Sequence, residues 1–256
     1  MNSAFTPYED VNQILNLLLE NVQEGLGEQF VGMYLYGSLS SGDFNPESSD
    51  LDFCVVTQDH LPEETIANLE TMHKRIWSSP SKWAAKLEGA YLPKSHIRRH
   101  TLSGPACPVV NESKFYVDTP GSDWIIQRHV IREKGIVLAG PDPKTLIDFV
   151  SPEDIRGAVL GVLRKWWFPM LENPVWLVEH GSEYHTFAII SMCRALHAVE
   201  HGTIVSKPVA AAWAKSQMPD QAQWIETALR SQHGGGDGFA TEALNFIRLV
   251  KERVSQ

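Results

Sequence analysis

Two short β-rich runs joined by a small polar segment are the feature that most constrains the fold of this chain. Residues 34–56 read YLYGSLSSGDFNPESSDLDFCVV, and the runs at 31–36 and 51–57 predict two strands. Asp50 and Asp52 stand at the start of the second run, and side chains two residues apart in a strand point to the same side. Neighbouring carboxylates repel each other and are costly to bury, so either both acids face water or a positive group lies between them.

The residues around these strands suit metal-assisted chemistry on a phosphate. Gly37-Ser38 ends the first strand, where glycine allows close backbone approach and the following amides can bind phosphate oxygens. Asp50 and Asp52 can hold Mg²⁺, which prefers few protein oxygens together with substrate phosphates. Glu88, inside the apolar run AKLEGAYL, predicts a third acid on a neighbouring strand. Three such acids facing a phosphate loop suit nucleotidyl transfer. The alternative is that Gly37-Ser38 is only a turn and the acids only cap a strand.

Local patterns divide the chain into an α/β half and a helical half. Strands are expected at 31–36, 51–57, 87–92 and within GIVLAGPDP, and helices at 10–24, 63–77, 122–134, 183–202, 206–217, 219–231 and 238–254. The stretch 93–120 is rich in proline and is expected to be a loop. After about Ser151 the strand signals disappear, and SPEDIRG predicts a capped helix start. We therefore expect an α/β domain with a small mixed sheet over 1–150 and an all-α helical-bundle domain over 151–256.

Charge and composition narrow the class of partner. The chain has 256 residues and a formal net charge of −9, which argues against a nucleic-acid partner and is compatible with a cationic small molecule. It contains no run of eighteen apolar residues, so no membrane span is expected. The N-terminal stretch lacks the pattern of a secretory leader, and three scattered cysteines without a CxxC pair indicate reduced thiols. These features favour a cytoplasmic protein, and a monomer is the expected state.

Two segments carry a resemblance to a known family. YGSLSSGDFNPESSDLDFCVV resembles the GS…DxD signature of the polymerase-β-like nucleotidyltransferase superfamily. SMCRALHAVEHGTIVSKPVAAAWA, at 191–214, resembles the helical-domain segment of aminoglycoside adenylyltransferases that act on streptomycin and spectinomycin. The order of elements is similar from about residue 10 to 254. The resemblance implies an antibiotic-resistance activity: Mg²⁺-dependent transfer of AMP from ATP to a drug hydroxyl, with release of pyrophosphate.

The resemblance also implies roles for individual residues. Asp50 and Asp52 would bind two magnesium ions, and Glu88 would be the general base and a further metal contact. The nucleotide would be bound by Gly37, Ser38, Asp123, Arg194, Lys207 and His233. The drug would contact Glu88, His180, Glu183 and Tyr184. The acids with which streptomycin-modifying relatives bind their substrate are not matched cleanly, because the aligned positions are His180 and Tyr184.

Other readings of the same residues stay open. Arg194 lies within an apolar helical pattern and could form an ion pair between helices, and Lys207 could be an ordinary surface lysine. The chain could be a nucleotidyltransferase that acts on a protein or on another small molecule. It could also be a non-catalytic nucleotide-binding protein, although Asp50, Asp52 and Glu88 are all present and favour an enzyme.

Overall fold

The chain forms two compact units in the computed structural model, which describes residues 4–99, 104–111, 113–231 and 238–255. The first unit comprises residues 1–45 and 49–149, and the second comprises residues 46–48 and 150–256. The sequence placed a domain boundary after residue 150, and the compact units divide after Phe149.

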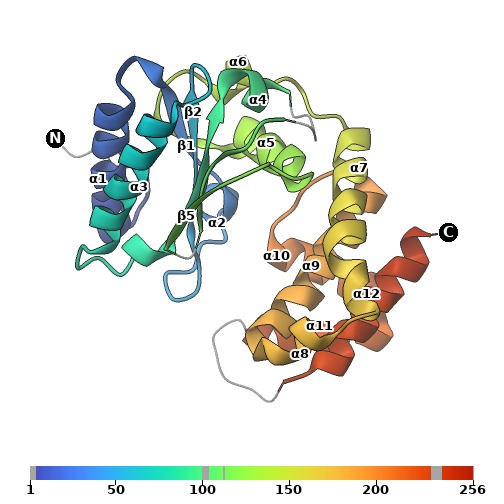
Figure 1. The fold of residues 1–256 in the computed structure, drawn as a ribbon. Coiled ribbons are helices and arrows are strands. Elements are labelled where there is room, and N and C mark those ends of the chain that lie inside the picture. Colours follow the sequence, from blue (N-terminus) through green and yellow to red (C-terminus); the bar gives the residue numbers. More distant parts are fainter. Residues whose placement is uncertain (1–3, 100–103, 112, 232–237, 256) are drawn as a thin grey trace. The chain divides into compact units, whose positions relative to one another are not determined.

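The first unit is built on a six-stranded mixed sheet with the strand order β5-β4-β3-β2-β1-β6 (Figure 1). The strands are β1 (Phe30–Leu35), β2 (Leu51–Thr57), β3 (Leu87–Pro93), β4 (Cys107–Asn111), β5 (Lys114–Asp118) and β6 (Ile136–Ala139). β2 and β3 are parallel, and the other neighbouring pairs are antiparallel. The parallel pair is connected through α3 (Glu63–Trp77), which matches the predicted helix at 63–77.

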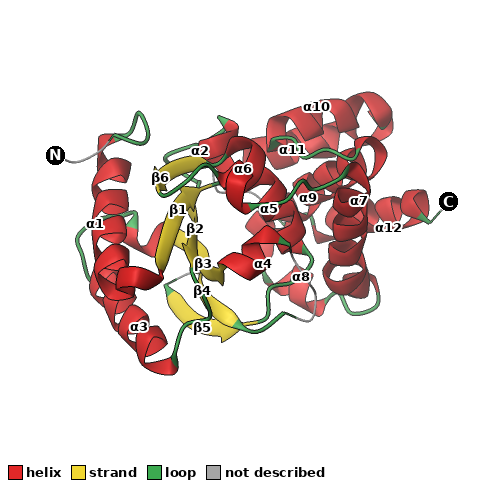
Figure 2. Ribbon diagram, turned by 90° about the horizontal axis from the view of Figure 1, so that it is seen from above, coloured by secondary structure: helices red, strands yellow, loops and turns green. Residues whose placement is uncertain are grey.

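Helices cover both faces of this sheet. α1 (Glu9–Leu26) and α3 lie side by side on one face, and α5 (Asp123–Lys134) lies on the other (Figures 1 and 2). The shorter helical segments are η1 (Gly27–Gln29), α2 (Gly37–Ser41), η2 (Ala84–Lys86), α4 (Lys94–Arg98) and α6 (Pro143–Leu146). The apolar side of α1 explains its position, because Val11, Leu15 and Leu18 are all completely buried in the core between helices and sheet. Each such side chain contributes about 1.5–3 kcal/mol by leaving water.

The expectation of a loop over 93–120 was wrong. This stretch contains α4 and the two antiparallel strands β4 and β5. Pro108 lies inside β4 opposite Val117, and proline within a run normally argues against a strand. The side chains of β5 are mostly exposed, so no alternation of buried and exposed residues marks it in the sequence. Pairing with a neighbouring strand, rather than local propensity, forms these two strands.

The second unit is all helical, as the sequence predicted. Its segments are α7 (Pro152–Val162), a π-helical turn η3 (Leu163–Trp167), η4 (Phe168–Leu171), α8 (Val175–Glu179), α9 (Gly181–His201), α10 (Lys207–Gln217), η5 (Pro219–Gln221), α11 (Ala222–Ser231) and α12 (Ala240–Val254). α9 is the central helix and packs against α7, α10, α11 and α12. Among the described residues, no helix combines the length and the apolar content that a membrane span requires.

Side-chain hydrogen bonds fix the ends of several of these helices. α7 begins with a capping box in which the Ser151 hydroxyl accepts from the Asp154 amide at 3.1 Å, as SPEDIRG indicated. The imidazole of His185, buried in α9, hydrogen-bonds the Leu177 carbonyl at 3.0 Å through Nε2. Its Nδ1 accepts from the Phe239 amide at 3.1 Å. His185 therefore joins α8 and the start of α12 to the central helix.

Candidate active site

Two carboxylates are brought together by the register of the parallel strands β2 and β3. Asp52 lies directly opposite Glu88, between the pairs Leu51–Leu87 and Phe53–Gly89. Both acidic side chains are half-buried, whereas most of their neighbours along the two strands are fully buried. The sequence predicted acids on two neighbouring strands, and the register shows that two of them are paired across the strands.

In the turn after β1, the backbone of Gly37 lies close to the Asp52 side chain. Gly37 has a φ of +66°, and a Cβ atom there would lie 1.9 Å from Asp52 Oδ2. Only glycine fits at this position, because a side chain would both strain the backbone and displace the carboxylate. The amide of Tyr36 donates to the Asp52 carbonyl at 3.1 Å, which ties the turn to β2.

The segment after Gly37 is a short helix rather than the expected phosphate-binding loop. α2 starts at Gly37 itself and contains Ser38 in its first turn. The first amides of a helix have no partners within that helix, so they can donate to a bound anion. The amides that the sequence assigned to phosphate binding therefore belong to a short helix and not to a loop.

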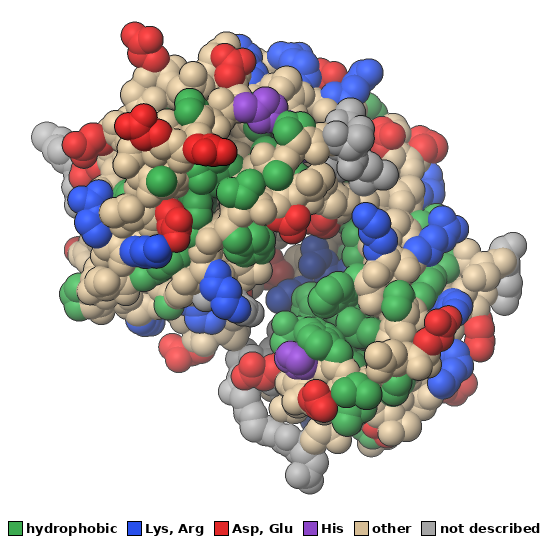
Figure 3. Space-filling view, viewed as in Figure 1, with side chains coloured by type: hydrophobic (Ala, Val, Ile, Leu, Met, Phe, Trp, Pro, Cys, Tyr) green, Lys and Arg blue, Asp and Glu red, His purple; other side chains and the backbone are tan. Residues whose placement is uncertain are grey.

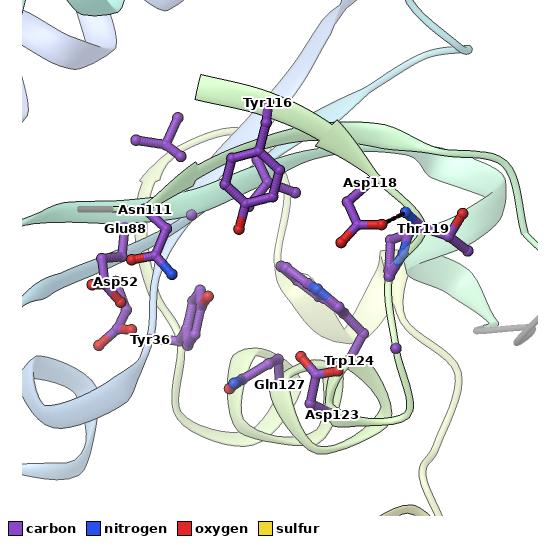
Figure 4. A pocket seen from close by; sticks show the side chains of 15 residues that line it. Tyr36, Asp52, Glu88, Asn111, Tyr116, Asp118, Thr119, Asp123, Trp124 and Gln127 are labelled. Carbon is purple, nitrogen blue, oxygen red and sulfur yellow. Dashed lines mark hydrogen bonds between the residues drawn. The ribbon is translucent and has the colours of Figure 1, made fainter. Parts of the chain in front are cut away.

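A cavity of about 280 Å³ opens beside the two carboxylates within the first unit. Figure 4 shows Asp52 and Glu88 at one end and Asp118 and Asp123 at the other. Tyr36, Tyr116 and Trp124 lie between the two pairs of acids. The remaining lining residues are Gly89, Val109, Val110, Asn111, Thr119, Pro120, Gly121 and Gln127. No lysine, arginine or histidine occurs among these described lining residues, so the cavity presents four acids without a basic side chain.

Tyr36 supplies a neutral hydroxyl to this acidic cavity. Its side chain is 6% exposed, and its ring packs edge-on against Trp124 with the ring centroids 6.2 Å apart. Burial raises the pKa of the phenol well above its usual value, and the nearby charges of Asp52, Glu88 and Asp123 raise it further. The hydroxyl therefore stays protonated and can donate a hydrogen bond at any physiological pH.

Asp50 is held differently from Asp52. It is not among the residues that line the cavity, and its Oδ1 lies 3.0 Å from Lys86 Nζ. The sequence left open a positive group between Asp50 and Asp52, and the structure places the Lys86 ammonium group at Asp50. Within the described ranges, no cluster of three or more histidine, cysteine, aspartate or glutamate residues is placed to hold a metal ion. The set Asp50, Asp52 and Glu88 therefore stays a prediction as a group of metal ligands.

The other residues assigned to the nucleotide lie in different parts of the chain. Asp123 starts α5, is exposed and lines the cavity. In the second unit, Arg194 is half-buried on α9 and has an interaction partner, and Lys207 is the exposed first residue of α10. His233 lies outside the described residues. The roles of all four residues in nucleotide binding remain predictions.

Two of the residues assigned to the acceptor belong to an aromatic cluster in the second unit. The rings of His180 and Tyr184 are 5.0 Å apart, and Trp176 stacks on His180 at 4.1 Å. The ring nitrogen Nδ1 of His180 hydrogen-bonds the Trp176 carbonyl at 2.6 Å. Glu183 is exposed on α9. Trp176 was not predicted to be part of this group.

Several residues of the candidate site could not be recognised in the sequence. They are Tyr36, Lys86, Asn111, Tyr116, Asp118, Trp124 and Gln127. Tyr36 and Trp124 adjoin the predicted residues Gly37 and Asp123, and this proximity was the available signal. Asn111, Tyr116 and Asp118 belong to the strands that were expected to be a loop.

Comparison with known families assigns a different family to each half of the chain. Residues 15–99 match the family "Nucleotidyltransferase domain", and residues 145–253 match "Aminoglycoside adenylyltransferase, C-terminal domain". These matches, together with the sheet and its paired acids, define the chain as a nucleotidyltransferase, which confirms the enzyme class predicted from the sequence. The chain belongs to the aminoglycoside nucleotidyltransferases.

Individual relatives are similar over nearly the whole chain. A "Spectinomycin 9-adenylyltransferase" of Enterococcus faecalis is 22% identical over 97% of this chain and 96% of its own length. An "Aminoglycoside (3'') (9) adenylyltransferase" of Shigella flexneri is 26% identical over 96% of each chain. The solved structure of an Enterococcus spectinomycin adenyltransferase with ATP and spectinomycin has a TM-score of 0.74 at 19% identity, covering 95% of this chain and 99% of that one. This likeness confirms the predicted fold.

Proposed function

We propose that the protein transfers AMP from ATP to a hydroxyl of an aminoglycoside-type antibiotic of the streptomycin and spectinomycin class, with release of pyrophosphate. The pairing of Asp52 with Glu88, directly beside the Gly37 turn, is the observation that carries this proposal. The names of the relatives support it, because they are spectinomycin and aminoglycoside adenylyltransferases.

Asp52 and Glu88, with Asp50, are the residues that would hold magnesium. Their carboxylates offer the hard oxygen ligands that Mg²⁺ prefers, and few protein ligands leave room for water and substrate phosphates. We propose two magnesium ions, which when bound would neutralise the negative charge that develops on the reacting phosphates.

Glu88 would act as the general base in the transfer. It accepts the proton of the acceptor hydroxyl while the oxygen forms a bond to the α-phosphorus of ATP. The bond from that phosphorus to the bridging oxygen breaks, and pyrophosphate leaves with the electron pair. Gly37 and Ser38 would orient the triphosphate through the amides at the start of α2. We assign Asp123, Arg194, Lys207 and His233 to the nucleotide from the family resemblance.

The cavity suits a cationic acceptor. Four carboxylates line it without a basic residue among the described lining side chains, so a polyamine or guanidine-bearing ligand would find charge partners there. The resemblance adds His180, Glu183 and Tyr184 in the second unit as acceptor contacts. Cys54, Cys107 and Cys193 are free and buried, which agrees with the cytoplasmic location that forms part of this proposal. A monomer is the proposed state.

A panel of acceptors tests the proposed function. The protein is incubated with Mg²⁺, ATP and, separately, streptomycin, spectinomycin, further aminoglycosides and candidate proteins, while pyrophosphate release and product mass are measured. We expect one drug of the class to gain a single adenylyl group in the wild type and far less in Glu88→Gln. Adenylylation of a protein and not of any drug would favour the alternative substrate class, and no transfer to any acceptor would contradict the proposal.

A further inference from the structure

Lys86 and Asp50 belong to a small group of charged residues at the N-terminal ends of β2 and β3. The parallel register places Leu51 opposite Leu87 and Asp52 opposite Glu88. Asp50 and Lys86 stand one residue before Leu51 and Leu87, and their side chains meet at 3.0 Å. Lys86 ends η2 and Asp50 precedes β2, so the Asp50–Lys86 pair comes directly before the Leu51–Leu87 pair and the Asp52–Glu88 pair comes directly after it. These residues carry three carboxylates and one ammonium group.

We propose that Lys86 is an internal cation that competes with magnesium for Asp50. In the structure the Lys86 ammonium group holds the Asp50 carboxylate, and it is displaced when a metal ion binds the same oxygen. The inference rests on the proposed function in one respect, namely that Asp50 and Asp52 are metal ligands.

Electrostatics explains why such a competitor is useful here. Three carboxylates at the starts of two neighbouring strands repel one another, and an ammonium group beside Asp50 reduces this repulsion. An ammonium group and a divalent cation repel each other at ion-pair distance, so each weakens the binding of the other to the same oxygen. The charge of Lys86 therefore lowers the affinity of the acids for free metal.

The exposure of the pair sets the size of this effect. The side chains of Lys86 and Asp50 are 46% and 39% exposed, and exposed ion pairs of this kind contribute little. Because a metal ion must first displace Lys86, the affinity of the site for free metal should be lower by about twofold to fivefold. When the metal binds together with ATP, the released Lys86 ammonium group can bind phosphate oxygens instead, and this contact offsets the loss of the ion pair with Asp50. Lys86 thereby makes metal binding depend on the nucleotide, and the dependence is reciprocal.

Titration with Mn²⁺ as a paramagnetic probe tests the proposal without turnover. Binding is measured by the loss of the free-ion signal, with and without a non-hydrolysable ATP analogue, for wild type, Lys86→Met and Lys86→Arg. Lys86→Met keeps the aliphatic stem and removes the charge, so we expect it to bind Mn²⁺ alone about twofold to fivefold more tightly. The gain in Mn²⁺ affinity on adding the nucleotide analogue should be smaller than in the wild type. Lys86→Arg keeps the charge and should resemble the wild type.

A double-mutant cycle isolates the pair from other effects of removing a charge. In the Asp50→Asn background, the carboxylate for which Lys86 competes is gone, so Lys86→Met should no longer change Mn²⁺ affinity. An equal effect of Lys86→Met in both backgrounds would overturn the competition and leave only a general change of charge. Unchanged Mn²⁺ affinity in Lys86→Met would also overturn it, and Lys86→Gln repeats the measurement if Lys86→Met is unstable.

Asp52→Asn separates failure of this inference from failure of the proposed function. We expect Asp52→Asn to lose most Mn²⁺ binding, with or without Lys86. If Asp52→Asn binds Mn²⁺ like the wild type, or if no variant binds it, the metal site of the proposed function is wrong and the role of Lys86 falls with it. If Asp52→Asn loses binding while Lys86→Met behaves like the wild type, only the role of Lys86 is overturned.

Discussion

Glu88 can serve as a base or as a metal ligand, and its surroundings allow both. It lies opposite Asp52 in the sheet and lines the cavity that also contains Asp118 and Asp123. A base must reach the hydroxyl of the acceptor, whereas a metal ligand must reach the ions beside the triphosphate. The two roles differ in what happens to ATP binding when the carboxylate is removed.

Glu88→Gln should lower adenylyl transfer by roughly 10²–10⁴, because the amide keeps the size of the side chain and loses the base. ATP binding, measured by calorimetry, should persist. Glu64→Gln, at an exposed position in the first turn of α3, is the matched control and should leave both quantities unchanged. Loss of ATP binding in a folded Glu88→Gln protein would show that Glu88 acts mainly as a metal ligand.

Gly37→Ala should reduce both stability and turnover. The new Cβ would lie 1.9 Å from Asp52 Oδ2 at a φ of +66°, so the Asp52 carboxylate has to move. Left-handed backbone at a residue with a side chain costs about 1–2 kcal/mol, and the clash adds to this. Chemical denaturation and steady-state kinetics measure the two effects.

Gly42→Ala is the matched control for Gly37→Ala. Gly42 follows the other end of α2 in left-handed conformation, and a Cβ atom there meets nothing within 4 Å. The Gly42→Ala variant should lose stability because of its left-handed backbone and should keep the adenylyl-transfer activity of the wild type. Equal turnover in the two variants would mean that contact of Gly37 with Asp52 has no role in the site.

At the scale of elements, α3 is joined to β3 by a buried polar pair. The Nε2 atom of His73 lies 2.7 Å from the Tyr91 hydroxyl, and the side chain of His73 is completely buried. Its ring packs near Phe53 and Phe115, and its Nδ1 has no hydrogen-bond partner. Burial lowers the pKa of His73 to about 4, because a charged imidazole would lose its hydration in this core.

The free energy of unfolding should therefore fall as the pH is lowered from about 6.5 to about 4. In this window the unfolded chain binds a proton at His73 and the folded chain does not, so stability decreases with decreasing pH. The full contribution is about 3 kcal/mol, from the difference between the two pKa values. Urea denaturation at several pH values measures it.

His73→Gln provides the control for this pH dependence. Glutamine can still hydrogen-bond Tyr91 and cannot titrate, so the variant should show a shallower loss of stability between pH 6.5 and pH 4. Other titrating groups contribute to both proteins and cancel in the comparison. Parallel curves for the wild type and His73→Gln would contradict the assignment of this proton uptake to His73.

At the scale of the whole molecule, the cavity is more one-sided in charge than the surface. The chain carries a net charge of −9, yet acidic and basic side chains are interspersed on the face shown in Figure 3. The described lining of the cavity, in contrast, contains four acids and no basic residue. A cavity lined by one sign of charge attracts ligands of the opposite sign, and salt screens this attraction.

The KM for a cationic acceptor should rise by about threefold to tenfold when the ionic strength is raised from about 0.05 to 0.5 M. The value of kcat should change less, because the charges act mainly on binding. Asp118→Asn should flatten the dependence, since it removes one carboxylate far from Glu88 within the cavity. The KM for ATP, measured in the same series, is the internal control. A salt-independent KM for the acceptor would show that the acids do not attract it.

The sequence by itself determined the elements whose local pattern is strong. The apolar periodicity of α3 predicted its bounds, and the β-rich runs predicted β1, β2 and β3. The helical second half followed from the same kind of signal. The sequence also singled out Asp52, Glu88 and Asp123, which line the cavity, and Gly37, which lies against Asp52, and the roles assigned to these residues remain predictions. In each case the information lies within a few residues along the chain.

Only the tertiary structure decided which side chains meet. The parallel register of β2 and β3 places Asp52 opposite Glu88 and Asp50 beside Lys86, and a shift by one residue would turn these side chains to the other face. Strand pairing also decides that β4 and β5 carry Asn111, Tyr116 and Asp118 to the lining of the cavity. Strand pairing joins residues that are distant in sequence, and the energy that selects it comes from partners that a local pattern does not contain.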